Sequence, residues 1–186
     1  SAGRDLKMSR EYYIFWYRLD GKDVYLIWFT DEEDGFVTDE NGFVPGFESA
    51  GHLQNYASRI GVDSVKEDSH LFDLDFVQNW LKGKSNEIED YNPFLEALNM
   101  FIDISASTNG NFDSDRKLTL KIYEKIFWGC NLPAVTPEGK SYEPIWSKIE
   151  LKIIRETLSF GLQTVREKVK LNKNPDVFRY TQSTEY

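Results

Sequence analysis

The chain has 186 residues, of which 31 are acidic and 22 basic, and it carries a formal net charge of −9. Its 40% hydrophobic and 15% aromatic content excludes an intrinsically disordered protein, and no stretch approaches the roughly 20 apolar residues that a membrane span requires. A single cysteine, Cys130, excludes a disulfide framework and a cysteine-based zinc site. We therefore expect a protein that binds a partner without a cofactor and is not an enzyme.

The order of strand-like and helix-like segments predicts one α+β domain over residues 8–171. An N-terminal antiparallel β-hairpin or meander is expected to precede about five helices, the last one long. Met8 is the expected native start, which makes residues 1–7 an added or flexible segment, and the polar residues 172–186 are expected to form a flexible C-terminal tail. The N-terminus shows no signal-peptide pattern, which favours the cytoplasm.

Two β-prone segments, residues 12–17 and 24–29, flank a turn in which Gly21 can adopt a positive φ. They predict an antiparallel hairpin, and because both segments are apolar at nearly every position, both faces are expected to be covered at least in part. A second hairpin is predicted from residues 35–38 and 42–45, turned by residues 39–42 with their Asn-Gly pair. Its last residue, Pro45, restricts that strand to a short or edge position.

From Ser49 onward the apolar residues recur at helical spacing. Ser49 is expected to cap a helix that ends at Gly61, and Asp73 or Asp75 to cap a second that ends at Gly83. Three further helices are predicted, beginning at Asn92-Pro93, near Arg116, and near Trp146 with an end near Leu171. Gly161 interrupts the last of these and predicts close packing at that point. A polar loop is expected at residues 105–115.

Acidic residues are concentrated in the first part of the chain. Residues 1–115 hold 23 acidic and 9 basic side chains, for a net −14, whereas residues 116–186 hold 8 and 13, for a net +5. This asymmetry favours a basic protein partner and disfavours nucleic acid or a membrane. The alternative is that the acidic runs are solvated turns that keep the protein soluble. The residues predicted to contact a partner are Asp31, Glu32, Glu33, Asp34, Asp39, Glu40, Glu67, Asp68, Asp73 and Asp75.

Tight binding also needs desolvated aromatic anchors beside the charges. The aromatic residues closest in sequence to the acidic runs are Phe36, Phe43, Phe47 and Tyr91, although such residues are more often part of a core. Catalytic and metal motifs fail at specific positions. Residues 83–85 lack the upstream glycine of a P-loop, and the Asp31–Gly42 loop has glycine and phenylalanine where calcium ligation needs an oxygen ligand and a glycine. The alternating Asn109, Asn111, Asp113 and Asp115 also lack the glycine of a calcium loop, and His52 and His70 are expected to be satisfied or solvent-facing.

Three segments carry a resemblance at the level of pattern: LFDLDFVQNWL at residues 71–81, FLEALNMFIDI at 94–104 and YEKIFWGCNLPAVTP at 123–137. Together they resemble small bacterial immunity proteins encoded beside the toxins of contact-dependent growth-inhibition and polymorphic toxin systems, over roughly residues 12–170. The resemblance implies a cytoplasmic antidote that binds one cognate toxin domain and blocks its active site. Many such toxins are basic nucleases, which would suit an acidic inhibitor, but no binding residue is implied by motif.

Two alternatives remain open from the sequence. One is a phage-type DNA mimic, which would carry carboxylates spaced like phosphates along an extended face. The other is a hydrolase with an acidic, metal-dependent site, which would need two or more carboxylates converging in a pocket.

Overall fold

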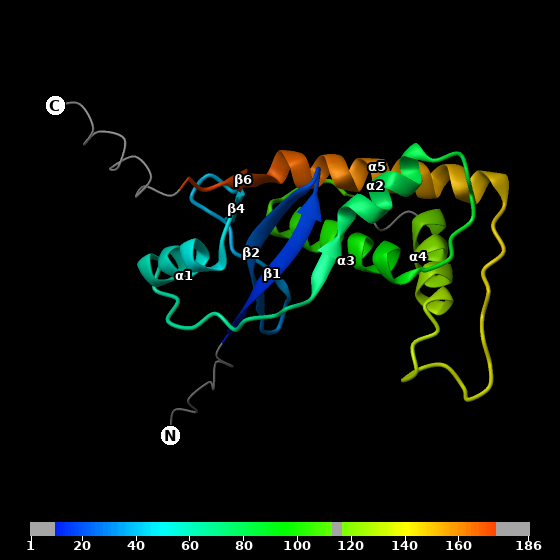
Figure 1. Ribbon diagram of the computed structural model, residues 1–186, viewed down its shortest axis with the longest axis horizontal. Coiled ribbons are helices and arrows are strands. Elements are labelled where there is room, and N and C mark those ends of the chain that lie inside the picture. Colours follow the sequence, from blue (N-terminus) through cyan, green and yellow to red (C-terminus); the bar gives the residue numbers. More distant parts are fainter. Residues whose placement is uncertain (1–9, 113–116, 174–186) are drawn as a thin grey trace, which may run out of the picture.

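The computed structural model describes residues 10–112 and 117–173, and within them the protein has the predicted α+β architecture (Figure 1). Among the helices of these residues, none has both the length and the apolarity needed to cross a bilayer. The elements in chain order are β1 (Glu11–Leu19), β2 (Lys22–Thr30), β3 (Gly35–Phe36), β4 (Val44–Gly46), α1 (Ala50–Arg59), β5 (Leu71–Asp73), α2 (Leu74–Lys82), α3 (Asn92–Ser107), α4 (Lys117–Gly129), α5 (Lys148–Lys168) and β6 (Val169–Leu171).

The predicted first hairpin is confirmed and is the centre of the larger sheet, whose strand order is β3-β2-β1-β5. β1 and β2 pair antiparallel from Glu11↔Thr30 to Leu19↔Lys22. The two turn residues, Asp20 and Gly21, have φ values of 54° and 71°, the left-handed pair that matches the twist of a tight hairpin. β5 adds to β1 in parallel.

The predicted second hairpin is wrong, although its turn forms. The Asp39 N–H donates to the Phe43 carbonyl at 2.7 Å, and Gly42 has a φ of 82°. However, β3 pairs with β2, while β4 pairs in parallel with β6 in a separate two-stranded sheet. The glycine at position 46 fits this arrangement. A Cβ there would lie 2.9 Å from both Val169 and Val24, so only a residue without a side chain lets the backbone of β4 lie this close to β6 and to the first hairpin. The short β4 suits Pro45, as expected.

Both faces of the hairpin are covered, as its sequence predicted. One face, which includes Phe15 and Tyr17, packs into the main core with α2, α3, α4 and α5. The other face, which includes Ile14 and Ile27, packs with Phe47 and α1 into a smaller core. Figure 1 shows α1 on the opposite side of the hairpin from α3 and α4. Successive side chains of β1 point to opposite faces of the sheet, so the hairpin separates two cores, one on each face.

Local signals set the ends of the first two helices as predicted. The Ser49 side chain accepts the His52 N–H at 3.1 Å, and the Asp73 side chain accepts the Phe76 N–H at 3.1 Å. At the end of α1, Gly61 has a φ of 84° and the Val62 N–H donates to the Ala57 carbonyl at 2.8 Å. This bond closes a Schellman motif, which satisfies a carbonyl that the helix end leaves unpaired.

The last helix is shorter than predicted at both ends. It begins after Ser147, whose side chain forms a reciprocal capping box with Glu150, and it ends at Lys168. The next three residues form β6, because the edge of β4 offers backbone partners that continued helix would leave unpaired. The Asn172 N–H continues this pairing to the Gly46 carbonyl at 2.7 Å. Residues 1–7 and 174–186 of the predicted end segments lie outside the described residues.

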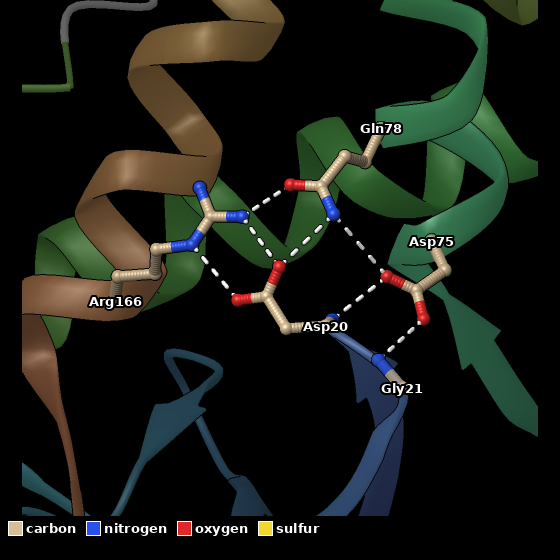
Figure 2. Close-up of polar contacts among 5 residues, drawn as sticks. All are labelled: Asp20, Gly21, Asp75, Gln78 and Arg166. Carbon is tan, nitrogen blue, oxygen red and sulfur yellow. Dashed lines mark hydrogen bonds and ion pairs between the residues drawn. The ribbon is translucent and has the colours of Figure 1, made fainter. Parts of the chain in front are cut away.

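A polar network joins the tip of the first hairpin to α2 and α5 (Figure 2). The Asp75 carboxylate accepts the backbone N–H groups of Asp20 and Gly21 at 2.8 and 2.9 Å. The Asp20 carboxylate in turn accepts two bonds from the Arg166 guanidinium, at 2.9 and 3.1 Å, and one from the Gln78 amide at 3.0 Å. Arg166 also donates to the Gln78 side-chain oxygen. The network fixes the hairpin tip against two helices.

Asp20→Asn is expected to remove an acid-sensitive part of the stability. Hydrogen bonds from Arg166, and then from Gln78, lower the pKa of Asp20 to about 2. Stability from this carboxylate is therefore present above about pH 4 and lost as the pH falls towards 2. Because the side chain is half exposed, we expect a loss of about 1 kcal/mol or less at about pH 6, and none near pH 2. Urea unfolding at the two pH values checks this, and an equal loss at both would contradict it.

Candidate functional site

A groove of about 520 Å³ lies between α3 and the face of the larger sheet that packs on it. Strands β1, β2 and β5 form one side, and α3 forms the other. Two connecting segments, β2–β3 and the chain before β5, each add an acidic residue. The lining residues are Tyr13, Ile14, Phe15, Trp28, Asp34, Asp68, Phe72, Asn99, Met100, Ile102 and Asp103.

Aromatic rings form the sheet side of the groove. Tyr13 and Trp28 are directly opposite each other on β1 and β2, with ring centroids 5.7 Å apart. Phe15 is two residues further along β1 on the same face, and its ring stacks on Phe72 at 4.1 Å. Because β5 pairs in parallel with β1, it brings Phe72 to this face from a distant part of the sequence. This side of the groove is therefore aromatic, although the Tyr13 ring already has the Lys66 ammonium 5.4 Å from its centre.

Three carboxylates, Asp34, Asp68 and Asp103, line the same groove. Asp68 is oriented by accepting the His70 N–H at 3.0 Å. The pKa of Asp103 is raised to about 6, mainly by burial; the Trp28 side chain offsets part of the rise, and the nearby charge of Asp34 adds to it. None of the described basic side chains forms an ion pair with these three residues. The groove thus holds uncompensated negative charge beside aromatic rings.

Several other acidic residues of the described chain are paired with a basic side chain. Asp23 contacts Arg18 at 2.6 Å, and Glu150 contacts Lys125 at 2.7 Å. The contrast is sharpest in a neighbouring hollow of about 560 Å³, which shares Asp34 with the groove. There the Arg10 guanidinium lies 3.8 Å from the centre of the Phe29 ring and bonds to Asp31 at 2.7 Å.

The structure brings together only some of the acidic residues predicted to contact a partner. Asp31–Asp34 line the hollow, with Asp34 and Asp68 in the groove and Glu67 next to Asp68 in the chain. The other four lie elsewhere. Asp73 caps α2, and Asp75 binds the tip of the first hairpin. The tip is roughly 25 Å from the opposite end of the nine-residue strands β1 and β2, where the β2–β3 loop with Asp31–Asp34 begins. Asp39 accepts backbone N–H groups within its own turn. Asp39 and Glu40 also lie near Tyr56 of α1, whose pKa is raised by burial first and then by these two charges.

The aromatic anchors proposed from sequence are not the rings of this groove. Phe36 and Phe47 are 2% and 0% exposed and belong to the two cores, so the alternative interpretation of these two as core residues is correct. Phe43 lies under the Lys170 ammonium, 5.0 Å from its ring centre, and the Tyr91 hydroxyl accepts a bond from Trp146 at 2.8 Å.

Asp103 is the groove residue that sequence reasoning missed most clearly. It ends a polar stripe on an otherwise apolar helix, since Asn92, Glu96, Asn99 and Asp103 are spaced four, three and four residues apart. That spacing places them on one helix face, which points away from the main core. An isolated polar stripe on such a helix is therefore the signal that could have identified this side of the groove.

The side chains that could take part in catalysis, those of His52, His70 and Cys130, make contacts that belong to the fold. His52 is 6% exposed rather than solvent-facing as expected, and its ring meets Phe47 edge-on. The His70 ring nitrogen lies 2.7 Å from Glu96. Burial raises the pKa of the Cys130 thiol to about 11, which makes it a poor nucleophile. Within the described residues, no three His, Cys, Asp or Glu side chains are grouped so that they could hold a metal ion, and Asp113 and Asp115 lie outside them.

Comparison with protein families, with curated proteins and with solved structures found no match to this chain.

Asp103→Asn is expected to stabilise the protein by about 1–2 kcal/mol at about pH 7.5 and to change little at about pH 4. Because its folded-state pKa of about 6 is above the usual value, the folded protein retains a proton that the unfolded chain releases between about pH 4 and 6. The free energy of unfolding of the parent protein therefore falls as the pH rises through that window. An asparagine has no proton to release, so the variant does not lose this stability. Urea unfolding at both pH values tests this. A difference that does not depend on pH would contradict it.

Proposed function

We propose that this protein is a cytoplasmic immunity protein, or antitoxin, that binds a basic bacterial toxin domain of the nuclease class. It neutralises the toxin by covering the active site with its acidic surface. The observation that carries the proposal is that Asp34, Asp68 and Asp103, which have no ion-pair partner among the described residues, lie beside half-buried aromatic rings and next to the acidic Asp31–Asp34 loop.

The physical chemistry of nucleases supports this pairing. A nuclease domain presents lysine and arginine side chains to bind phosphates, so a compact acidic surface can occupy the same groups. Complementary charge raises association rate constants to as much as roughly 10⁸–10⁹ M⁻¹s⁻¹ at low salt, which suits an antidote that must reach the toxin before the substrate does. Aromatic rings beside the charges provide the desolvated contacts that slow dissociation.

A compact arrangement also distinguishes this proposal from DNA mimicry. Asp34, Asp68 and Asp103 come from three separate parts of the chain and surround one groove, whereas a mimic of the phosphate backbone needs carboxylates along an extended face. Three carboxylates do line one groove, as the hydrolase would need, but within the described residues no three His, Cys, Asp or Glu side chains are grouped so that they could hold its metal ion. We therefore propose only the immunity function.

We expect a toxin domain to be encoded beside the gene for this protein, and the test uses that domain. Purified toxin is assayed for nuclease activity with and without one equivalent of the protein, and association rates are measured at low and high salt. We expect stoichiometric loss of nuclease activity and an association rate that falls at least about tenfold at high salt. Full nuclease activity in the presence of excess protein would overturn the proposal.

A further inference from the structure

We propose that the groove between β1, β5 and α3 is an arginine-binding site that accepts one arginine side chain of the partner. The inference rests on the proposed function, because it identifies which group of the basic toxin the acidic surface receives. Its guanidinium would lie against the Trp28 ring and bond to the carboxylates of Asp34 and Asp103.

The charge of the groove favours a bound cation. Asp103 is part-buried with Asp34 close to it, and two neighbouring carboxylates without a counter-ion repel each other. Elsewhere in the described chain, the half-buried Asp23 by contrast has a counter-ion, Arg18. The protein therefore keeps a costly arrangement in this groove that a bound cation would relieve.

The shape of the groove selects an organic cation over a metal ion. Asp34, Asp68 and Asp103 line one cavity of about 520 Å³, yet they are not grouped so that they could hold a metal ion. A guanidinium is planar, stacks on aromatic faces and donates in a fork that matches carboxylates, whereas an ammonium is compact and strongly hydrated. Flat rings beside separated carboxylates therefore favour arginine over lysine.

The molecule uses the same mode of binding twice for its own arginines. In the hollow next to the groove, Arg10 lies on the Phe29 ring and bonds to Asp31. On α5, the Arg155 guanidinium lies 4.3 Å from the centre of a Trp80 ring and donates to the Leu81 carbonyl at 3.1 Å. The groove has the same two components, ring and oxygen acceptor, but among the described residues no arginine occupies it.

The experiment uses N-acetyl-arginine amide as the probe, followed by the indole N–H signal of Trp28 in NMR spectra at about pH 7.5. We expect the signal to shift and saturate in the millimolar range, and the citrulline analogue, which has the same shape without the charge, to cause no saturable shift. The lysine analogue is expected to bind at least about threefold more weakly than arginine.

Variants locate the site. Asp34→Asn and Asp103→Asn are each expected to weaken binding of the arginine probe about tenfold, because each removes a charged acceptor. Glu89→Gln is the matched control, since it removes one exposed acidic charge from the α2–α3 loop, and we expect it to leave binding unchanged. Equal binding of citrulline and arginine, no saturable shift with arginine, or equal weakening by all three variants would overturn the proposal.

This result is separable from the test of the proposed function. The probe experiment needs no toxin, so an arginine site can exist even if the protein does not inhibit a nuclease. Conversely, if the protein inhibits the toxin but the Trp28 signal ignores the arginine probe, the immunity function stands and the arginine site is wrong.

Discussion

Gly161→Ala is expected to destabilise the protein by about 3 kcal/mol, although the same change in an exposed helix adds up to about 1 kcal/mol of stability. A Cβ at this position of α5 would lie 2.0 Å from the Phe101 ring of α3, which is fully buried. Neither group can rotate away, because the ring is packed in the main core and the Cβ is fixed to the backbone. The two helices would have to separate, with an overpacking cost at the upper end of the usual range. Urea unfolding measures the loss.

Two variants control for this result. Gly51→Ala, in α1, adds a Cβ that has no atom within 4 Å, and it is expected to leave stability equal or higher by up to about 1 kcal/mol. Phe101→Ala combined with Gly161→Ala is expected to cost less than the sum of the two single changes, because alanine removes the ring atoms that the new Cβ would meet. A stability of the single Gly161→Ala variant within about 0.5 kcal/mol of the parent would show that α3 and α5 are not packed this closely.

Reversing the charge of the β2–β3 loop is expected to slow toxin association about 100-fold at low salt while leaving the fold intact. The variant replaces Glu32, Glu33 and Asp34, all exposed, by lysine. Asp31 is kept, because its carboxylate accepts the Glu33 N–H at 2.9 Å and pairs with Arg10, so it supports the loop. Like charges would then oppose a basic toxin at the rim of the groove, and steering contributes about 10–1000-fold to such rates. Stopped-flow measurement gives the rate constants.

The matched control makes the same charge change at three exposed acidic residues away from the groove, which are Glu87 and Glu89 of the α2–α3 loop and Glu143. The α2–α3 loop contacts α5, because the Arg155 guanidinium donates to the Ser85 carbonyl at 3.0 Å, and none of its residues lines the groove. We expect a much smaller decrease, about threefold, from the change in net charge alone. If both triple variants associate equally fast, net charge and not the local acidic surface steers the encounter.

Elements that depend on neighbouring residues could be predicted from the sequence. The first hairpin follows from its β-prone segments and the Asp20-Gly21 turn, and α1 from the Ser49 cap and Gly61. The predictions that failed needed distant partners. Nothing near Val44 or Val169 in the sequence indicates that they pair, so β4 was predicted to join β3, and the end of α5 was predicted to continue as helix.

The candidate site could be predicted only in part, for the same reason. The Asp31–Asp34 run and Asp68 were identified by charge, because runs of acidic residues are visible in the sequence. The rings beside them were not, because Phe72 reaches Phe15 only through the parallel pairing of β5 with β1. Asp103 is a single acidic residue in an apolar helix, and its role depends on the fold that places Asp34 beside it.

The pairing of Val44 with Val169 also constrains how the protein is made. During synthesis the partner of β4 leaves the ribosome 125 residues after it, so the smaller sheet cannot close until almost all of the described chain has emerged. The groove residues all precede residue 104, but α3 stays uncovered on its α5 side until the same moment. A nascent chain is therefore expected to display its acidic rim before it has a completed core behind it.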